Sequence, residues 1–375
     1  METVSVRPVV TRRDMDMFIA LPWLLYKNDP YWVPPLKKHL RRNLDPARHP
    51  FWQHARRQLF LAERGGSCVG RICTHVDFTY NTYWNEQAGC FGFFESENKP
   101  ATARALFDAA AGWLRKEGMT TMRGPMNPSS TTEFGFLVSA ASQPPAFLMP
   151  YNPPWYPELA VQNGFAVIKH LLAYEKDCKN SPTPDSVYRI ASRLKKNPRY
   201  AVRPVSKKQF AADVRIITNL YNECWGGHWA YSPVSYEEML HDFKAMKFYL
   251  DEKLTVLAFY DDQPVGMVIN MPDLNEVFKL ANGTLNLKGL LKILWFRTRF
   301  SRTRTLLLGF KKRFHKMGLP ALAYCEMEPA IRRLFYAMEA SWVHDDDHDV
   351  IDLLEGLGFV VSNRYAVVER SLFRL

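Results

Sequence analysis

The sequence predicts an α/β (α+β) fold made of two similar halves, each a mixed, mostly antiparallel twisted sheet flanked by helices. The chain has 375 residues, of which 47% are hydrophobic, so each half is large enough to bury its own core. The order strand, helices, strand hairpin, strand, helix, strand, helix, strand occurs twice. Both halves also end alike, because Gly164-Phe165 and Gly358-Phe359 each precede an apolar stretch that ends in an acidic–basic pair.

In the first half, alternating apolar residues bounded by turn residues predict strands, and apolar residues three to four apart predict helices. The strands are expected at 4–10, 58–63, 68–77, 90–95, 121–124 and 166–174. The helices are expected at 13–28 and 101–117, and Gly118 suits the end of the second helix. The Arg-Gly-Gly turn at 64–66 makes the second and third strands a hairpin.

The same patterns recur in the second half. Its strands are expected at 201–205, 254–260, 264–271, 303–310, 341–344 and 359–369. Its helices are expected at 207–224, 236–247, 319–340 and 347–355, with Pro329 as a potential break in the third. A polar, proline-bearing stretch separates the halves, so the expected division is an N-terminal half at 1–178, a junction at 179–199 and a C-terminal half at 200–375.

Composition narrows the class of protein. The six cysteines are scattered and none forms a CxxC pair, which argues against a zinc or redox-dithiol site. No apolar signal segment follows the N-terminus, and the apolar stretch at 287–296 is too short to span a bilayer. We therefore expect a cytoplasmic protein, with peripheral binding at the inner face of the cytoplasmic membrane as a further option. The net charge of +11 favours anionic partners, but nucleic acid is not expected because the basic residues are dispersed and no nucleic-acid motif is present.

Five short stretches are similar to those of a known family. They are Asp29-Pro30-Tyr31-Trp32-Val33-Pro34-Pro35, Gly124-Pro125-Met126-Asn127-Pro128-Ser129, Tyr151-Asn152-Pro153-Pro154-Trp155-Tyr156, Asn222-Glu223-Cys224-Trp225 and Pro272-Asp273-Leu274-Asn275-Glu276. With the order of elements, they make nearly the whole chain resemble the GNAT superfamily of acyl-CoA-dependent N-acyltransferases. Within it, the chain is similar to a bacterial double-GNAT family that includes ceramide synthases. The resemblance implies transfer of a long-chain acyl group from acyl-CoA to a sphingoid-type amine.

GNAT proteins hold the CoA pyrophosphate on a loop that resembles Q/R-x-x-G-x-G/A, between a strand and the next helix. The second half offers a basic loop in that context, where backbone N–H groups and the helix dipole would bind an anion. The candidate cofactor-binding residues are Phe310, Lys311, Lys312, Arg313, His315, Lys316 and Gly318. His315 stands where Gln or Arg is usual, and Pro320 stands where a small residue is usual. The alternative is a basic surface loop that caps a helix.

The matching place in the first half, 94–100, contains Glu95 and Glu97 and no glycine. These carboxylates would repel a pyrophosphate. We therefore expect the first half to serve as a scaffold or as the wall on the acceptor side.

Direct acyl transfer needs a base for the amine and a proton for the leaving thiolate, but no covalent nucleophile. Asp273 and Glu276, just past the strand at 264–271, are the base candidates, and capping of a turn or helix is their alternative role. Many GNAT enzymes carry a tyrosine acid in the helix before the last Gly-Phe pair, but here Leu354 takes that position. Tyr324 is the substitute candidate, with a place in the core of its helix as the alternative.

Other polar residues could contact the acceptor. Asn127 and Glu133 could line its pocket or cap their own loop, and the family-like stretches add Tyr151, Asn152, Trp225 and Asn275. His344 and His348 flank an acidic run, but an exposed helix start accounts for that run and no metal is expected. A basic amphipathic segment at 282–305 could bind an anionic membrane or pack on the core.

These observations predict an N-acyltransferase that moves an acyl group from acyl-CoA or an acyl carrier protein to a lipid-like amine. The alternative is a non-catalytic GNAT-fold module that binds acyl chains or a carrier protein.

Overall fold

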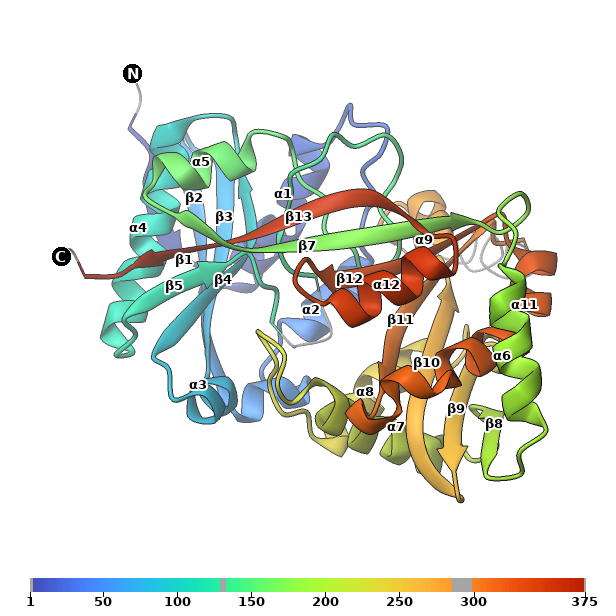
Figure 1. Cartoon of the computed structure of the whole chain (residues 1–375). Coiled ribbons are helices and arrows are strands. Elements are labelled where there is room, and N and C mark those ends of the chain that lie inside the picture. The colour runs from blue at the N-terminus through green and yellow to red at the C-terminus, as the bar shows by residue number, and fades with distance from the viewer. Residues whose placement is uncertain (1–2, 129–132, 285–298, 374–375) are drawn as a thin grey trace. The chain divides into compact units, whose positions relative to one another are not determined.

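The computed structural model describes residues 3–128, 133–284 and 299–373. The chain divides into two compact units, each described by itself. Unit 1 contains Met1–Leu171, Phe278–Leu290 and Asn363–Leu375, and unit 2 contains Leu172–Val277 and Leu291–Ser362. Each unit carries a mixed sheet flanked by helices, which confirms the predicted fold class (Figure 1).

Unit 1 is built on strands in the order β1-β2-β3-β4-β5-β13. The strands are β1 (Ser5–Pro8), β2 (Ala55–Arg64), β3 (Ser67–Asp77), β4 (Ala88–Ser96), β5 (Thr121–Gly124), β6 (Phe136–Leu137) and β13 (Val360–Ser371). The helices are α1 (Arg12–Leu25), α2 (Lys37–Asn43), the 3-10 helix η1 (Pro50–Gln53), α3 (Phe78–Trp84), α4 (Pro100–Lys116) and α5 (Tyr156–Gln162). β4 and β5 are parallel, whereas β1 to β4 form antiparallel pairs.

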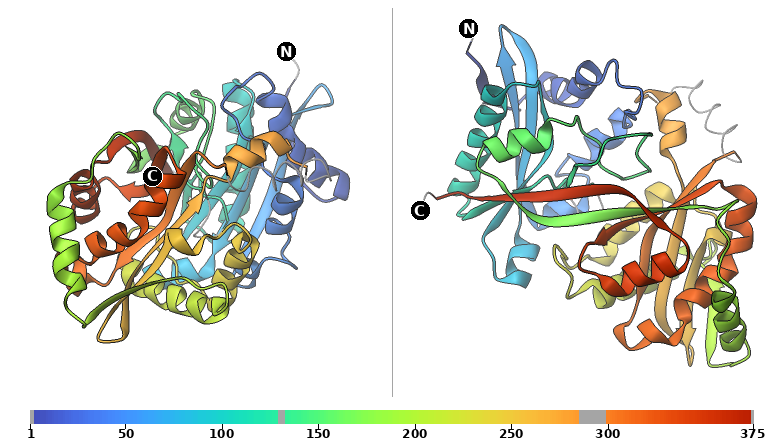
Figure 2. Two further views of the ribbon diagram at one scale, coloured as in Figure 1. Left: turned by 90° about the vertical axis from the view of Figure 1, so that its right-hand side faces the viewer. Right: turned by 45° about the horizontal axis from the view of Figure 1, so that its top comes forward.

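Two hydrophobic clusters cover the opposite faces of the unit 1 sheet, because successive side chains of a strand alternate between faces. On β3, Ile72 joins the cluster that includes α4 and α5. The next residue, Cys73, joins the cluster that includes α1 and α2. Both faces of this sheet are therefore covered by helices (Figure 2).

Unit 2 is built on strands in the order β7-β12-β11-β10-β9-β8. The strands are β7 (Ala166–Asp177), β8 (Tyr200–Pro204), β9 (Thr255–Tyr260), β10 (Gln263–Pro272), β11 (Arg302–Phe310) and β12 (Ala337–His344). The helices are α6 (Asp185–Lys195), α7 (Phe210–Trp225), α8 (Tyr236–Met246), η2 (Glu252–Leu254), η3 (Lys312–Met317), α11 (Leu319–Leu334) and α12 (His348–Gly356). The helix α9 (Asn275–Ala281) begins in unit 2, and its residues from Phe278 on belong to unit 1. α7 packs against β10 and β11, and α11 packs against β8 to β10 and α6.

The repeated acidic–basic pairs have matching roles at the ends of β7 and β13, and each of these strands has residues in both units. Lys176 Nζ, near the end of β7, donates to Leu357 O at 2.5 Å, and Leu357 is the C-cap of α12. Arg370 Nη1, near the end of β13, donates to Asn163 O at 3.0 Å, and Asn163 is the C-cap of α5. A cation at a helix C-terminus satisfies a backbone carbonyl and suits the helix dipole. The basic residue that follows one Gly-Phe pair therefore caps the helix that precedes the other Gly-Phe pair.

Some elements differ from the prediction. The helix expected at 319–340 ends at Leu334, although Pro329 lies inside it, and the extended backbone of Phe335 leads into β12. The stretch expected as a junction contains α6, which packs on α11, and α3 was not predicted. Most of the predicted basic amphipathic segment, 285–298, lies outside the described residues.

Candidate functional site

The parallel strands β11 and β12 of unit 2 are paired along only part of their length, and we call the arrangement of paired and unpaired parts a fork. The ladder between β11 and β12 ends at the Thr305–Ala340 pair, although both strands continue beyond it. The register between β10 and β11 shifts at the same place, which leaves Leu306 as an extra residue on β11. Such a bulge redirects backbone groups away from the regular ladder. The strand that leads toward the predicted phosphate loop is therefore irregular where its parallel partner leaves it.

The predicted phosphate loop follows the open end of this fork. The chain passes from β11 through the 3-10 helix η3 to α11, so most of the predicted loop is helical. Gly318 joins the two helices with φ of +81°, and a Cβ there would lie 2.4 Å from Ile190. As the N-cap of α11, Gly318 offers no side chain to its first N–H groups. A helix start of this kind attracts anions.

Four of the predicted cofactor residues lie on η3 or at the end of β11. Lys312, Arg313 and Lys316 have exposed side chains on η3. Phe310 ends β11 and packs beside Gly266, where a Cβ would lie 2.1 Å from its ring. Three cations thus face solvent beside the start of α11, while Phe310 has a packing role.

Lys311 and His315 have partners within unit 2. Lys311 Nζ lies 2.7 Å from Glu223 Oε2. His315 Nε2 lies 2.8 Å from Phe310 O, and its Nδ1 lies 3.1 Å from Asp349 Oδ2. The hydrogen bond with His315 lowers the pKa of Asp349. His315 therefore ties η3 to β11 and α12.

The corresponding fork of unit 1 is closed by the chain itself. Met126 N donates to Phe91 O at 2.6 Å, and Phe93 N donates to Asn127 Oδ1 at 2.9 Å. Phe93 lies in a bulge of β4, as Leu306 does in β11. Asn127 Nδ2 donates to Glu133 Oε2 at 2.9 Å. Of these two predicted substrate contacts, Asn127 thus binds the backbone of β4, and Glu133 holds the Asn127 amide.

Unit 2 has a different side chain at the equivalent position. The ladder of unit 1 ends at the pair Cys90–Arg123, and the ladder of unit 2 ends at the pair Thr305–Ala340. Counting four residues on from Arg123 gives Asn127, and the same count from Ala340 gives His344. The ring of His344 packs beside that of Trp229, with centroids 6.1 Å apart.

The acidic stretch after β4 is also engaged by the fold of unit 1. Glu95 Oε2 accepts hydrogen bonds from the hydroxyls of Tyr26 and Tyr156, both at 2.8 Å, and Arg71 Nη2 lies 3.4 Å from Glu95 Oε1. Burial raises the pKa of Glu95. Glu97 contacts Arg64, Lys99 and Thr102. The place that matches the basic loop of unit 2 is thus occupied by hydrogen-bonded carboxylates.

Two further predicted substrate contacts hold family-like stretches of unit 1 in place. The Tyr151 hydroxyl contacts both carboxylate oxygens of Asp29, at 2.8 and 2.7 Å. Burial raises the pKa of Tyr151. Asn152 Oδ1 accepts from Leu137 N at 2.7 Å, and its Nδ2 donates to Leu137 O at 3.2 Å. The stretches that begin at Asp29 and Tyr151 therefore meet in the folded unit.

The predicted bases Asp273 and Glu276 lie together at the start of α9. Asp273 is 2% exposed and accepts a hydrogen bond from Asn275 N at 3.1 Å. Burial raises its pKa to about 7, although Arg302, 3.7 Å away, acts in the opposite direction. Glu276 Oε1 accepts from Ser301 N at 3.1 Å and from Arg302 N at 2.8 Å. Glu276 thereby fixes the backbone at the beginning of β11, and Asn275 is a neighbour of Asp273.

Tyr324 belongs to a different cluster of unit 2. Its hydroxyl lies 3.3 Å from Thr183 Oγ1, which donates to Glu328 at 2.6 Å. Lys176 Nζ lies 5.2 Å from the centre of the Tyr324 ring. Burial raises the pKa of Tyr324. Leu354, where the family's tyrosine is usual, is buried in α12.

Trp225 lies beside the open part of the fork. Its ring would be 2.4 Å from a Cβ at Gly309, a residue of β11 beyond the ladder with β12. The ring also stacks on Tyr221, with centroids 5.1 Å apart. Of the six predicted substrate contacts, Trp225 is the one placed against the open part of β11.

A buried charged cluster that was not predicted from the sequence lies at the closed end of the fork, where β11 and β12 are still paired. Its members are Glu175, Asp273, Arg302, Arg304, Glu339 and the hydroxyl of Ser341. Both arginines belong to the basic amphipathic segment predicted at 282–305, and Arg304 also falls in the strand predicted at 303–310. In the structure both lie on β11, and Arg304 is 2% exposed. Arginine and threonine alternate at 302–305, just before an apolar run, and a period of two residues is typical of a strand with both arginines on one face. This period is the sequence signal that could have placed both arginines on a strand.

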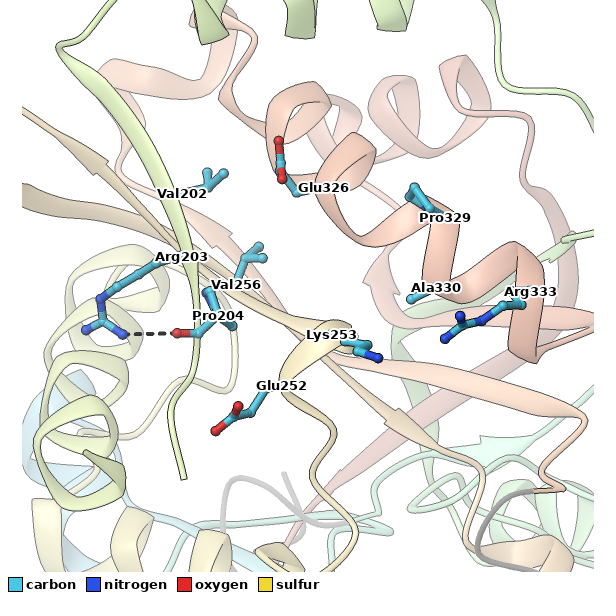
Figure 3. Close-up of a pocket in the computed structure, with 10 residues that line it drawn as sticks. All are labelled: Val202, Arg203, Pro204, Glu252, Lys253, Val256, Glu326, Pro329, Ala330 and Arg333. Carbon is cyan, nitrogen blue, oxygen red and sulfur yellow. Dashed lines mark hydrogen bonds between the residues drawn. The ribbon is translucent and has the colours of Figure 1, made fainter. Parts of the chain in front are cut away.

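A surface hollow of about 510 Å³ lies elsewhere on unit 2 (Figure 3). It is lined by Val202, Arg203, Pro204, Glu252, Lys253, Val256, Glu326, Pro329, Ala330 and Arg333. These residues come from β8, η2, β9 and the part of α11 from Glu326 on. The hollow is therefore distinct from the candidate site, which adjoins the N-terminus of α11.

Comparisons with known proteins identify the family. No protein-family model matches the chain, and no helix in its described residues is long and apolar enough to cross a membrane. The chain is 31% identical over 378 residues to the bacterial ceramide synthase of Caulobacter vibrioides, covering 98% of both chains. It is 28% identical over 376 residues to protein YghO of Escherichia coli, covering 98% of this chain and 95% of that one.

Solved structures agree on the fold. A tandem GNAT protein from the clavulanic acid biosynthesis pathway matches with a TM-score of 0.58 at 13% identity, covering 99% of each chain. A GCN5-related N-acetyltransferase from Sphaerobacter thermophilus matches with a TM-score of 0.54 at 12% identity, covering 99% of this chain and 96% of that one. The chain therefore belongs to the tandem-GNAT family of N-acyltransferases that includes the bacterial ceramide synthase.

Proposed function

We propose that this chain moves an acyl group from acyl-CoA to the amine of a lipid-like acceptor by direct attack. The observation that carries the proposal is the fork of β11 and β12, which leads to a helix start with three exposed cations beside it. The 31% identity to the bacterial ceramide synthase supports a sphingoid base as acceptor and a long-chain acyl-CoA as donor.

In this proposal each part of the donor has a place in unit 2. The pyrophosphate binds at the start of α11, where N–H groups and the helix dipole favour an anion, and Lys312, Arg313 and Lys316 add charge. The pantetheine arm follows the open part of β11, past Trp225. The thioester reaches the bulge at Leu306, next to the end of the ladder.

The proposal for the acceptor side is based on unit 1 and on the net charge of the chain. The N-terminal half, 1–178 in the sequence-based division, serves as scaffold and acceptor-side wall, because its own fork is closed and its matching loop is acidic. A lipid-like amine would come from a membrane, and the net charge of +11 favours approach to an anionic surface.

The first test is calorimetry of the protein with CoA, acetyl-CoA and palmitoyl-CoA. Replacing Lys312 and Arg313 together by alanine removes two exposed charges without touching the core. We expect CoA to bind about tenfold more weakly or worse, since charge-assisted hydrogen bonds contribute about 1.5–3 kcal/mol each. Gly318→Asp is a poorer probe, because Gly318 has a positive φ and contacts Ile190.

The matched control replaces Lys207 and Lys208, two exposed lysines before α7. This control changes the net charge equally, so unchanged CoA affinity in it would assign the loss to η3. Equal affinity of all three proteins for CoA would reject the site at η3.

The alternative is a non-catalytic module that binds acyl chains or an acyl carrier protein. Two observations favour it, namely Leu354 in place of the family's tyrosine and the engagement of His315 with Phe310 and Asp349. Release of CoA from palmitoyl-CoA with sphinganine as acceptor distinguishes the two functions, because a binding module releases none.

A further inference from the structure

The buried charged cluster lies where the fork closes, and its composition favours uptake of a proton. It brings three carboxylates toward two guanidinium groups, and these groups are Glu175, Asp273, Glu339, Arg302 and Arg304. Glu339 and Arg304 are partners in the parallel ladder and each is 2% exposed. Two of the three carboxylates, Asp273 and Glu339, are buried, and burial disfavours the charged form of a carboxyl group.

Ser341 connects this cluster to the fork. It is the first residue of β12 after Ala340, the last residue paired with β11, and it is 8% exposed. Its hydroxyl donates to Glu339 Oε1 at 2.7 Å and accepts from Arg304 Nε at 3.0 Å. Arg304 Nη2 also donates to Ser341 O at 3.1 Å. These contacts fix the hydroxyl with its hydrogen directed at the carboxylate.

The charges around Glu339 tune its affinity for a proton. Arg302 Nη2 lies 3.3 Å from Glu339 Oε2, and the same guanidinium lies 3.0 Å from Glu175 and 3.7 Å from Asp273. Burial raises the pKa of Glu339, while Arg304 and Arg302 act against that rise and Glu175 adds to it. A carboxyl group whose pKa is raised by its surroundings takes up a proton more readily than an exposed one.

We propose that Glu339 receives the proton of the attacking amine through the hydroxyl of Ser341. This inference rests on the proposed acyl transfer and places the acceptor amine at the closed end of the fork. Asp273 is then a positioning residue, since it shares Arg302 with Glu339. The bulge at Leu306 and the hydroxyl of Ser341 follow the same last pair of the ladder on opposite strands, so both can face one thioester.

The step balances without another reactant. The amine nitrogen forms a bond to the thioester carbonyl carbon and gives a proton to Ser341 Oγ, while Ser341 gives its hydroxyl proton to Glu339. The C–S bond then breaks, and the sulfur leaves with the electron pair. The proton held on Glu339 returns through Ser341 to the thiolate, so the products are the amide and CoA thiol.

The test compares four variants, Glu339→Gln, Ser341→Ala, Ser341→Thr and Asp273→Asn, with palmitoyl-CoA and sphinganine as probes. Loss of a general base lowers the rate about 100-fold or more, so we expect that loss of kcat in Glu339→Gln. Ser341→Ala should lose activity similarly, and Ser341→Thr should recover it because threonine keeps the hydroxyl. The affinity for palmitoyl-CoA, measured by calorimetry, should stay close to that of the wild type in all four.

The pH profile separates proton transfer from a structural role. In the wild type, kcat/KM should rise as Glu339 loses its proton, and this rise should disappear in Glu339→Gln, whereas Asp273→Asn should keep it with a shifted midpoint. Wild-type-like kcat in Glu339→Gln, or loss of the rise in Asp273→Asn alone, would overturn this inference while leaving the acyl transfer intact. Failure of the wild type to release CoA with sphinganine and other long-chain amines would overturn the proposed function and the inference together.

Discussion

Burial makes the ionisation of Asp273 unfavourable, and this has a measurable consequence for stability. Its pKa is about 7 in the folded protein, compared with about 3.9 in an unfolded chain. Between these two values the folded state binds more protons than the unfolded state. The contribution of Asp273 to the free energy of unfolding therefore falls as the pH rises from about 4 to about 7, and it is level above that range.

Replacing Asp273 by asparagine should remove this fall, because asparagine does not ionise and keeps an oxygen for Asn275 N. Relative to the wild type, the variant should gain on the order of 2–4 kcal/mol of stability between pH 5 and pH 8. Urea unfolding at both pH values measures the difference. Asp352→Asn is the control, since Asp352 is exposed on α12. Parallel pH dependence in wild type and Asp273→Asn would show that Asp273 is ionised in both states.

The same residues show how far side-chain roles could be predicted from the sequence. The position of Asp273 and Glu276 after a strand was predictable, because it depends on a local pattern. The partners of Glu276 were not, since Ser301 and Arg302 lie 25 and 26 residues away and come close only when β10 and β11 pair. The catalytic role assigned to these carboxylates stays a prediction.

At the scale of elements, the two forks differ in the segment that comes after the second parallel strand. In the sequence, the two halves differ at matching places, where the first half has an acidic stretch at 94–100 and the second half has a basic stretch at 310–318. The structure adds that Asn127 binds the bulge of β4, whereas His344 stands at the corresponding place in β12 and packs beside Trp229. This contrast could not be predicted, because it depends on counting from strand partners that no local pattern reveals.

Closure of the fork in unit 1 requires glycine at two positions. A Cβ at Gly92 would lie 2.3 Å from Met126 O, and a Cβ at Gly124 would lie 2.4 Å from Phe91 O. Backbone oxygens cannot yield as a flexible side chain does, so we expect Gly92→Ala to lower the free energy of unfolding by about 1–3 kcal/mol or more. Gly112→Ala in α4 is the control, where no atom lies within 4 Å of the new Cβ and a gain of about 0.5–1 kcal/mol is expected.

Urea unfolding of both glycine variants measures these changes. A Gly92→Ala protein as stable as Gly112→Ala would show that the segment around Met126 can move away from β4. The fork of unit 1 would then be open to a ligand, and the contrast between the units would be lost.

At the scale of the whole molecule, the two halves share a fold but exchange the ends of their last strands. The two Gly-Phe pairs predicted the repeat correctly, because each stands at the same step of the same element order. Lys176 and Arg370 explain why the acidic–basic pairs recur, since each caps the helix before the other Gly-Phe pair. The sequence did not reveal this exchange, because a strand pattern does not specify which compact unit receives each end.

A chain with two similar halves could bind one or two molecules of donor, and the structure favours one. Unit 2 combines an open fork with exposed cations at the start of α11, whereas in unit 1 Asn127 occupies the bulge and carboxylates occupy the matching loop. Titration of CoA into the protein should therefore give a stoichiometry near one, and replacing Lys312 and Arg313 should weaken that single site. Two equivalents of CoA would mean that both units bind the donor. One equivalent with unchanged affinity in the double variant would mean that the single donor site lies in unit 1, and the acceptor would then have to be sought in unit 2, because each half can offer its fork to one thioester only.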